Sequence, residues 1–197
     1  MHEPAGKKIL ILRTDRLGDV LLSTPVAGAL KKHFPRSQLT FLVRQYTQPI
    51  AESCVHIDET MNIETFFNSY RKTRVIKLTR FFREQKFDIA IHLFPRPELA
   101  LATFLARIPI RVGTGYRFYS LLFNKRQYEH RKNASFHEAE YNLRLLRQLG
   151  IYENAVSFEI ELEQTAKEKV NRILTSAGIS RRQPIVVLHP GSGGSAR

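Results

Sequence analysis

The segment KKILILRTDRLGDVLLSTPVAGALKKHFP, residues 7–35, decides the fold class of this chain. It opens with an apolar run, residues 7–13, of the length and composition of a short buried β-strand. The loop TDRLG follows, and from about Asp19 to Phe34 apolar residues recur at helical spacing. A strand, a short loop and a helix in this order predict the start of an alternating β/α fold.

The same alternation continues along the chain. Further strands are expected at 38–43, 87–94 and 108–113, and helices at about 70–85, 96–108 and 135–150. Ser135 is the expected cap of the last of these helices, and Gly150 its expected end. Repeated alternation of this kind favours a mostly parallel, doubly wound sheet with helices on both faces.

After Gly150 the composition changes and predicts a domain boundary. An acidic segment that could be a strand precedes a polar-faced helix ending at Gly178, and SRRQP resembles a linker. We therefore expect one domain over residues 1–180, and the first strand and glycine-rich loop of a second, truncated domain over 181–197. The terminal HPGSGGSAR matches neither the P-loop nor the dinucleotide fingerprint. It is either a flexible Gly/Ser tail or a loop that presents backbone N–H groups to a phosphate.

Charge is the compositional feature that most needs an explanation. Lys plus Arg number 31 against 18 Asp plus Glu, a formal net charge of +13. Basic residues are concentrated in residues 71–86 and 117–132, so we expect an anionic partner. Charge alone does not distinguish among nucleic acid, lipid head groups and a phosphorylated sugar as that partner. Without a secretory signal or an apolar stretch of spanning length, the protein is expected in the cytoplasm. Cys54 is the single cysteine, and no histidine spacing predicts a metal site.

The loop after the first strand carries the candidate chemistry. Open α/β sheets bind ligands at the carboxyl ends of their strands, where this loop lies. Gly18 would permit a tight turn and the close approach of a ligand, and Asp19 in the first helical turn could act as a general base. Asp19 as a simple helix cap is the alternative interpretation. Asp15 is a second carboxylate in the same loop.

Residues 8–35 and the ending IVVLHPGSGGSAR together resemble the lipopolysaccharide heptosyltransferases, the ADP-heptose enzymes of glycosyltransferase family 9. The segments FDIAIHLFPRPELALATFLARIPIRVG and HEAEYNLRLL extend the resemblance over nearly the whole chain. It implies a GT-B glycosyltransferase of two Rossmann-like domains, of which this chain holds the N-terminal, acceptor-binding one. The C-terminal, nucleotide-sugar-binding domain would be truncated after its first strand and loop, and the chain alone would be inactive.

The resemblance also implies roles for individual residues. Asp19 would be the general base in the transfer of heptose from ADP-L-glycero-D-manno-heptose to the Kdo/lipid A inner core, with inversion at the anomeric carbon. The residues implied to bind the donor are Gly18, Ser192, Gly193 and Arg197, and those implied to bind the acceptor are Arg13, Thr14, Arg16 and Arg96. The donor is a substrate, and neither a cofactor nor a metal is implied.

The implied acceptor is an anionic lipid at the inner face of the cytoplasmic membrane, so peripheral membrane contact and no nucleic acid are expected. A related transferase that uses another nucleotide sugar is the alternative within the same enzyme class. A basic nucleic-acid-binding module is an alternative from another class, although the sequence has no zinc-finger pattern and no RNP stretch. A purely structural fragment with a linker tail is the third alternative.

Overall fold

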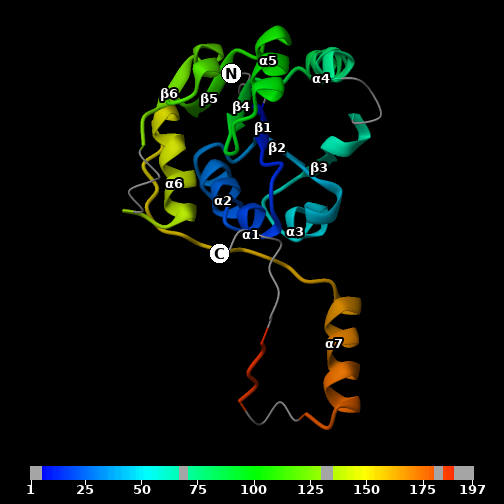
Figure 1. Cartoon of the computed structure of the whole chain (residues 1–197). Helices are drawn as coiled ribbons and strands as arrows, with labels where there is room; N and C mark the ends of the chain where they lie inside the picture. The colour runs from blue at the N-terminus through cyan, green and yellow to red at the C-terminus, as the bar shows by residue number, and fades with distance from the viewer. Residues whose placement is uncertain (1–5, 67–70, 130–134, 180–183, 189–197) are drawn as a thin grey trace. The chain divides into compact units, whose positions relative to one another are not determined.

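The computed structural model describes residues 6–66, 71–129, 135–179 and 184–188. The chain divides after Glu161 into two compact units, Met1–Glu161 and Leu162–Arg197. The boundary predicted between residues 180 and 181 falls outside the described residues and stays a prediction. The first unit contains the sheet and the helices that cover it (Figure 1).

The sheet of the first unit has six strands in the order β3-β2-β1-β4-β5-β6, and every neighbouring pair is parallel. The strands are β1 (Lys8–Leu12), β2 (Gln38–Val43), β3 (Glu59–Asn62), β4 (Ile89–His92), β5 (Ile110–Thr114) and β6 (Lys125–Gln127). This is the predicted doubly wound, Rossmann-like α/β fold. The two edge strands, ETMN and KRQ, were not predicted, because edge strands pair on one side only and do not need an apolar sequence.

Helices cover both faces of the sheet (Figure 1). One face carries α1 (Leu17–Leu21), α2 (Thr24–His33), α3 (Gln48–Glu52) and α6 (Glu138–Arg144), and the other carries α4 (Arg71–Gln85) and α5 (Pro97–Leu105). The described residues of the unit also form the 3-10 segments η1 (Gln45–Thr47), η2 (Ile63–Phe66), η3 (Phe118–Leu122) and η5 (Leu145–Leu149).

Strand β1 supplies both halves of the core. Ile9 and Ile11 belong to the cluster that packs under α2 and α6, and Leu10 and Leu12 to the cluster under α4 and α5. All four are at most 1% exposed. Successive side chains of a strand point to opposite faces, so a strand buried on both sides must be apolar throughout. This is why the apolar sequence of residues 8–12 correctly predicted a strand.

The helix predicted from Asp19 to Phe34 is interrupted. α1 ends at Leu21 and α2 begins at Thr24, with Pro25 in its first turn. The Ser23 hydroxyl donates to the Asp19 carbonyl at 2.7 Å and satisfies a group that the break would leave without a partner.

The helix predicted over 135–150 begins two residues later than its expected cap. His137, not Ser135, is the N-cap: its Nδ1 accepts from Ala139 N, and Glu140 Oε2 accepts from His137 N at 2.6 Å. Gly150, at φ 80°, ends the following η5, as predicted.

The second unit consists of α7 (Gln164–Ser176) and an extended stretch at 184–188. The strand predicted over residues 185–188 does not form a ladder within the described chain, and its four apolar side chains are exposed. A strand requires a hydrogen-bonded neighbour, and none of the described strands pairs with this one. None of the helices in the described ranges is long and apolar enough to cross a membrane.

Candidate active site

A cavity of about 620 Å³ opens at the carboxyl ends of β1, β4 and β5. The chain continues from β1 to β2 on one side and reaches β4 on the other, so this is the topological switch point of the sheet. The walls come from the segments that follow these strands and from α6, and they include Arg13, Asp15, Asp19, Phe94, Arg117 and Glu138. Ligands of doubly wound folds bind at this position.

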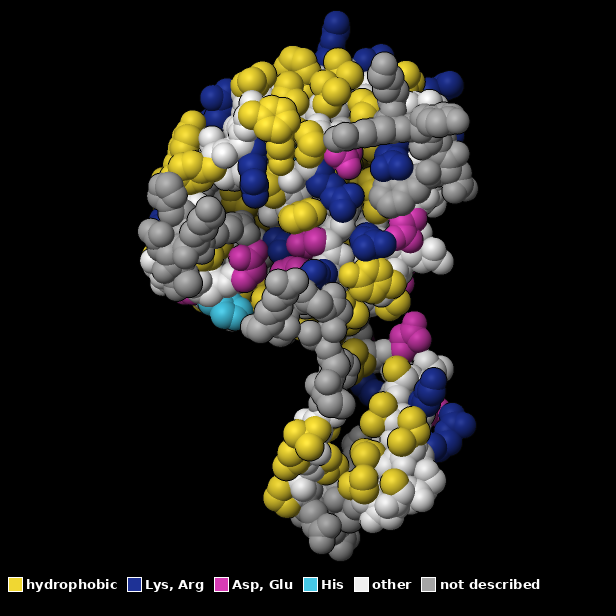
Figure 2. All heavy atoms as spheres, viewed as in Figure 1, with side chains coloured by type: hydrophobic (Ala, Val, Ile, Leu, Met, Phe, Trp, Pro, Cys, Tyr) yellow, Lys and Arg dark blue, Asp and Glu magenta, His cyan; other side chains and the backbone are white. Residues whose placement is uncertain are grey.

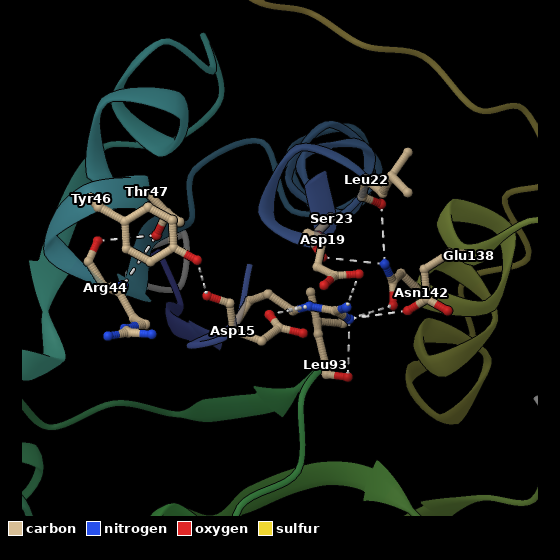
Figure 3. Close-up of polar contacts among 11 residues, drawn as sticks. Asp15, Asp19, Leu22, Ser23, Arg44, Tyr46, Thr47, Leu93, Glu138 and Asn142 are labelled. Atoms are coloured by element: carbon tan, nitrogen blue, oxygen red, sulfur yellow. Dashed lines mark hydrogen bonds and ion pairs between the residues drawn. The ribbon is translucent and has the colours of Figure 1, made fainter. Parts of the chain in front are cut away.

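A buried arginine organises the cavity. Arg13 follows β1, and its side chain is 4% exposed. Its Nε donates to Asp15 Oδ1 at 2.8 Å, Nη2 forms an ion pair with Asp19 Oδ1 at 3.0 Å, and Nη1 contacts Glu138 Oε1 at 3.1 Å. Nη1 also reaches the carbonyl of Leu93 and Oδ1 of Asn142, both at 3.4 Å. These partners converge on one point from four segments of the chain (Figure 3).

The geometry gives Arg13 a role inside the protein. Each of its three guanidinium nitrogens contacts at least one carboxylate of the chain. An arginine paired with three carboxylates is held in place and holds them in turn. Arg13 therefore holds the carboxylates that line the cavity, and its contact with the acceptor stays a prediction.

Asp19 lies at the third position of α1 and does not cap it. The residue at the N-cap is Arg16, and the helix start has no side-chain capping hydrogen bond. The Asp19 side chain is instead turned toward Arg13 and is 34% exposed at the cavity wall. The contact with Arg13 uses Oδ1, and no described residue donates a hydrogen bond to Oδ2. An accessible, oriented carboxylate oxygen is the arrangement that a general base requires.

Asp15 is the more enclosed of the two carboxylates, with a side chain 13% exposed. Burial raises its pKa, the negative charge of Asp19 raises it further, and Arg13 opposes both effects. Its backbone carbonyl accepts from the Tyr46 hydroxyl at 2.9 Å, and Arg44 lies 5.1 Å from the Tyr46 ring centre. Asp15 is thus fixed from both ends (Figure 3), and Asp19 is the freer group.

Two residues of α6 join the site without any signal in the sequence. Glu138 contacts Arg13, and Asn142 accepts from Arg13 while its Nδ2 donates to the Leu22 carbonyl at 3.1 Å and to Ser23 Oγ at 3.2 Å. Asn142 is fully buried. It therefore connects the α1–α2 break with the arginine network, a role that no local motif could have indicated.

The other predicted site residues differ in their position relative to the cavity. Gly18 is helical, so the tight turn expected there is absent, but a Cβ at this position would meet nothing within 4 Å, which leaves room for a ligand. Thr14 is fully buried and is not among the residues that line the cavity, and its contact with the acceptor stays a prediction. Arg16 is exposed, and Arg96 lies 5.6 Å from the ring centre of Phe94, a wall residue. Residues Ser192, Gly193 and Arg197 lie outside the described residues.

The cavity also reaches a buried histidine that the sequence did not single out. His92 ends β4, is 1% exposed, and contacts Thr103 Oγ1 through Nε2 at 3.1 Å. Burial, aided by the charge of Arg111, lowers its pKa from 6.5 to about 3. The ring is therefore neutral at physiological pH. Among the described residues, no group of three His, Cys, Asp or Glu side chains is placed to hold a metal ion.

Comparison with known proteins finds relatives over most of the chain. No family model matches the chain. A Haemophilus influenzae protein named "Putative glycosyltransferase" is 31% identical over 196 residues, which are 96% of this chain and 56% of that protein. Lipopolysaccharide heptosyltransferase 3 of Escherichia coli K12 is 27% identical over 178 residues, 88% of this chain and 51% of the enzyme. Over most of its length the chain is thus similar to a protein named as a glycosyltransferase and to lipopolysaccharide heptosyltransferase 3.

Solved structures of glycosyltransferases share the fold. A glycosyltransferase family 9 protein of Veillonella parvula superposes with a TM-score of 0.74 at 25% identity. The superposition covers 89% of this chain and 50% of the Veillonella protein. The Escherichia coli heptosyltransferase WaaC, solved with ADP-2-deoxy-2-fluoro heptose, superposes with a TM-score of 0.61 at 18% identity, over 77% and 51%. The chain spans about half the length of the curated relatives it matches.

Proposed function

We propose that this chain forms the acceptor-binding half of an inverting glycosyltransferase, with Asp19 as the general base. The transferred sugar is heptose from ADP-L-glycero-D-manno-heptose, and the acceptor is the Kdo-bearing lipid A inner core at the inner face of the cytoplasmic membrane. One observation carries the proposal: at the switch point of a heptosyltransferase-like sheet, Asp19 presents one carboxylate oxygen to a cavity while Arg13 holds the other at 3.0 Å.

The reaction needs one proton transfer and one displacement. An acceptor hydroxyl gives its proton to Asp19 Oδ2 as its oxygen bonds to the anomeric carbon of the heptose. The bond from that carbon to the ADP phosphate oxygen breaks, and ADP leaves with the electron pair. Because the attacking oxygen approaches opposite the leaving group, the configuration inverts.

Arg13 contributes by keeping the base in one place. Its guanidinium is flanked by Asp15, Asp19 and Glu138, so rotation of any one carboxylate would break a charge-assisted contact. Fixing a catalytic group before the substrate arrives removes an entropic cost from the reaction step. Arg13 is thus a positioning residue in this proposal.

Charged groups at the cavity rim suit an anionic acceptor. Arg117 lines the cavity with an exposed side chain, and Arg96 stands beside Phe94. Gly18, Ser192, Gly193 and Arg197 are assigned to the donor by the family resemblance. Because the chain spans about half of its relatives, we expect transfer only when a donor-binding half is supplied.

The test joins this chain to the part of the Haemophilus influenzae relative that it does not cover. Transfer from ADP-heptose to Kdo-bearing lipid A is then measured for the parent protein and for Asp19→Asn. Loss of a general base lowers kcat by roughly 100-fold or more, with acceptor binding retained. Glu84→Gln, an exposed carboxylate on α4 outside the cavity, is the control for charge removal.

Two results would contradict the proposal. Asp19→Asn with an unchanged kcat would remove Asp19 from the chemistry, whatever the donor. Faster transfer from another nucleotide sugar than from ADP-heptose would support the alternative of a related transferase, while retaining Asp19 as the base.

A further inference from the structure

Helix α5 is apolar on its outer side as well as on its inner side. Leu99 and Ala102 are buried against the sheet, yet Leu101, Phe104 and Leu105 are 38–44% exposed and share the opposite side of the helix. A helix that is apolar all round is normally covered on all sides.

Segment η3 packs against α5 and enlarges this surface. Phe118 is 85% and Leu121 is 68% exposed, although both are large apolar side chains. We call Leu101, Phe104, Leu105, Phe118 and Leu121 the α5–η3 face. In the space-filling view, hydrophobic side chains gather at the top of the first unit, where α5 lies (Figure 2). Exposed apolar groups concentrated in this way mark an interaction surface.

Arginines border the α5–η3 face. Arg83, Arg107 and Arg111 surround a depression of about 510 Å³ whose remaining walls include Phe104 and Leu105. Arg111 stacks on Phe104, with its guanidinium carbon 5.4 Å from the ring centre. The depression lies where β5 begins, at the opposite end of the sheet from the active-site cavity.

The side chains of Arg83, Arg111 and Arg126 are held in place by backbone carbonyls and not by acids. Arg83 donates to the Leu105 carbonyl at 2.8 Å, Arg111 to the Leu122 carbonyl at 2.8 Å and to that of Ile108. Arg126, after η3, likewise donates to the carbonyl of Phe123 at 2.9 Å.

No described carboxylate forms an ion pair with Arg83, Arg107, Arg111 or Arg126. Arg13, Arg44, Arg80 and Arg144, elsewhere in the first unit, do have carboxylate partners. The positive charge around the face is therefore oriented but not neutralised.

We propose that the α5–η3 face docks on an anionic phospholipid bilayer, with its apolar side chains in the interface and its arginines on the lipid phosphates. Leucine and phenylalanine bordered by cationic side chains are the composition of interfacial membrane anchors. Nucleic acid would use the arginines but leave the apolar groups in water, and a second copy would bring the same uncompensated charges together. The inference does not depend on transfer activity. Phe118 directly follows Arg117 of the cavity wall, so one end of the face lies next to the cavity rim, while the arginine depression lies at the other end of the sheet.

The test measures partitioning of the 197-residue chain onto vesicles of phosphatidylcholine with about one third phosphatidylglycerol, and onto phosphatidylcholine alone. Binding is expected on the anionic vesicles and weakened by salt. Because one arginine at an anionic surface is worth about fivefold in affinity, Arg83→Gln with Arg107→Gln should weaken binding by roughly 25-fold. Phe118→Asp with Leu121→Asp should weaken it by about tenfold or more.

Matched variants lie on the other side of the unit. Tyr152→Asp alters a side chain that is 73% exposed, and Lys32→Gln removes one exposed charge from α2; both should bind like the parent. Equal vesicle binding by the face variants and these controls would overturn the proposal. So would salt-sensitive DNA binding without vesicle binding, or a dimer disrupted by Phe118→Asp without vesicle binding. Loss of vesicle binding when the chain is joined to a donor-binding half would overturn it too, because that half would then cover the face.

Discussion

Acid should destabilise the first unit through a single buried ring, that of His92. Thr103 Oγ1 donates its one hydrogen to the Ala100 carbonyl at 3.0 Å, so His92 Nε2 must donate to Thr103. Nδ1 then carries the lone pair, and no described group donates to it. A second proton on this ring would be buried without an acceptor, which agrees with a pKa lowered to about 3.

The sign and size of the effect follow from linkage. The unfolded chain takes up a proton on His92 near pH 6.5 and the folded chain only near pH 3. The neutral ring therefore contributes its full stability above pH 6.5, and the free energy of unfolding decreases as the pH falls toward 3. The slope approaches about 1.4 kcal/mol per pH unit, which amounts to about 2 kcal/mol lost at pH 5.

Urea unfolding of the parent and of His92→Gln at pH 7 and pH 5 measures this directly. Glutamine retains an N–H for Thr103 and does not titrate, so the variant should gain about 2 kcal/mol relative to the parent between the two pH values. His33→Gln, at an exposed histidine, is the matched control. If the difference in free energy of unfolding between the parent and His92→Gln were the same at both pH values, the conclusion that the buried His92 ring is neutral would be refuted.

Three further substitutions follow from the backbone and the arginine network. Arg13→Met leaves Asp15, Asp19 and Glu138 without their shared cation and should lower the free energy of unfolding, measured in urea, by about 3–5 kcal/mol. An unchanged free energy of unfolding would show that the apolar core alone holds the unit together. Gly18→Ala should raise stability by about 0.5–1 kcal/mol, because the position is helical and open, while transfer by the joined protein falls as the methyl group meets the donor. Gly150→Ala should lower stability by about 1 kcal/mol, since φ is 80°; an unchanged thermal midpoint would show that this turn can relax.

Much of the sheet could be predicted from local sequence because burial on both faces forces continuous apolar runs. The strand at 38–43, the strand within 87–94 and most of the strand predicted over 108–113 were found in this way; the last, β5, ends one residue later, at Thr114. β3 and β6 were missed because they are short, polar and at the edges. The break between α1 and α2 has a local signal in Pro25, which lies in the first turn of α2, whereas its contact with Asn142, 119 residues from Ser23, has none.

The sequence by itself determined that Asp19 follows the first strand of a doubly wound sheet, at the end where ligands bind, because strand, loop and helix are local features. Only the tertiary structure decided what Arg13 does. Its partners Glu138 and Asn142 lie 125 and 129 residues away, and no spacing rule connects positions that meet only when α6 packs beside the end of β1. The same packing buries Arg13 among the carboxylates of Asp15, Asp19 and Glu138.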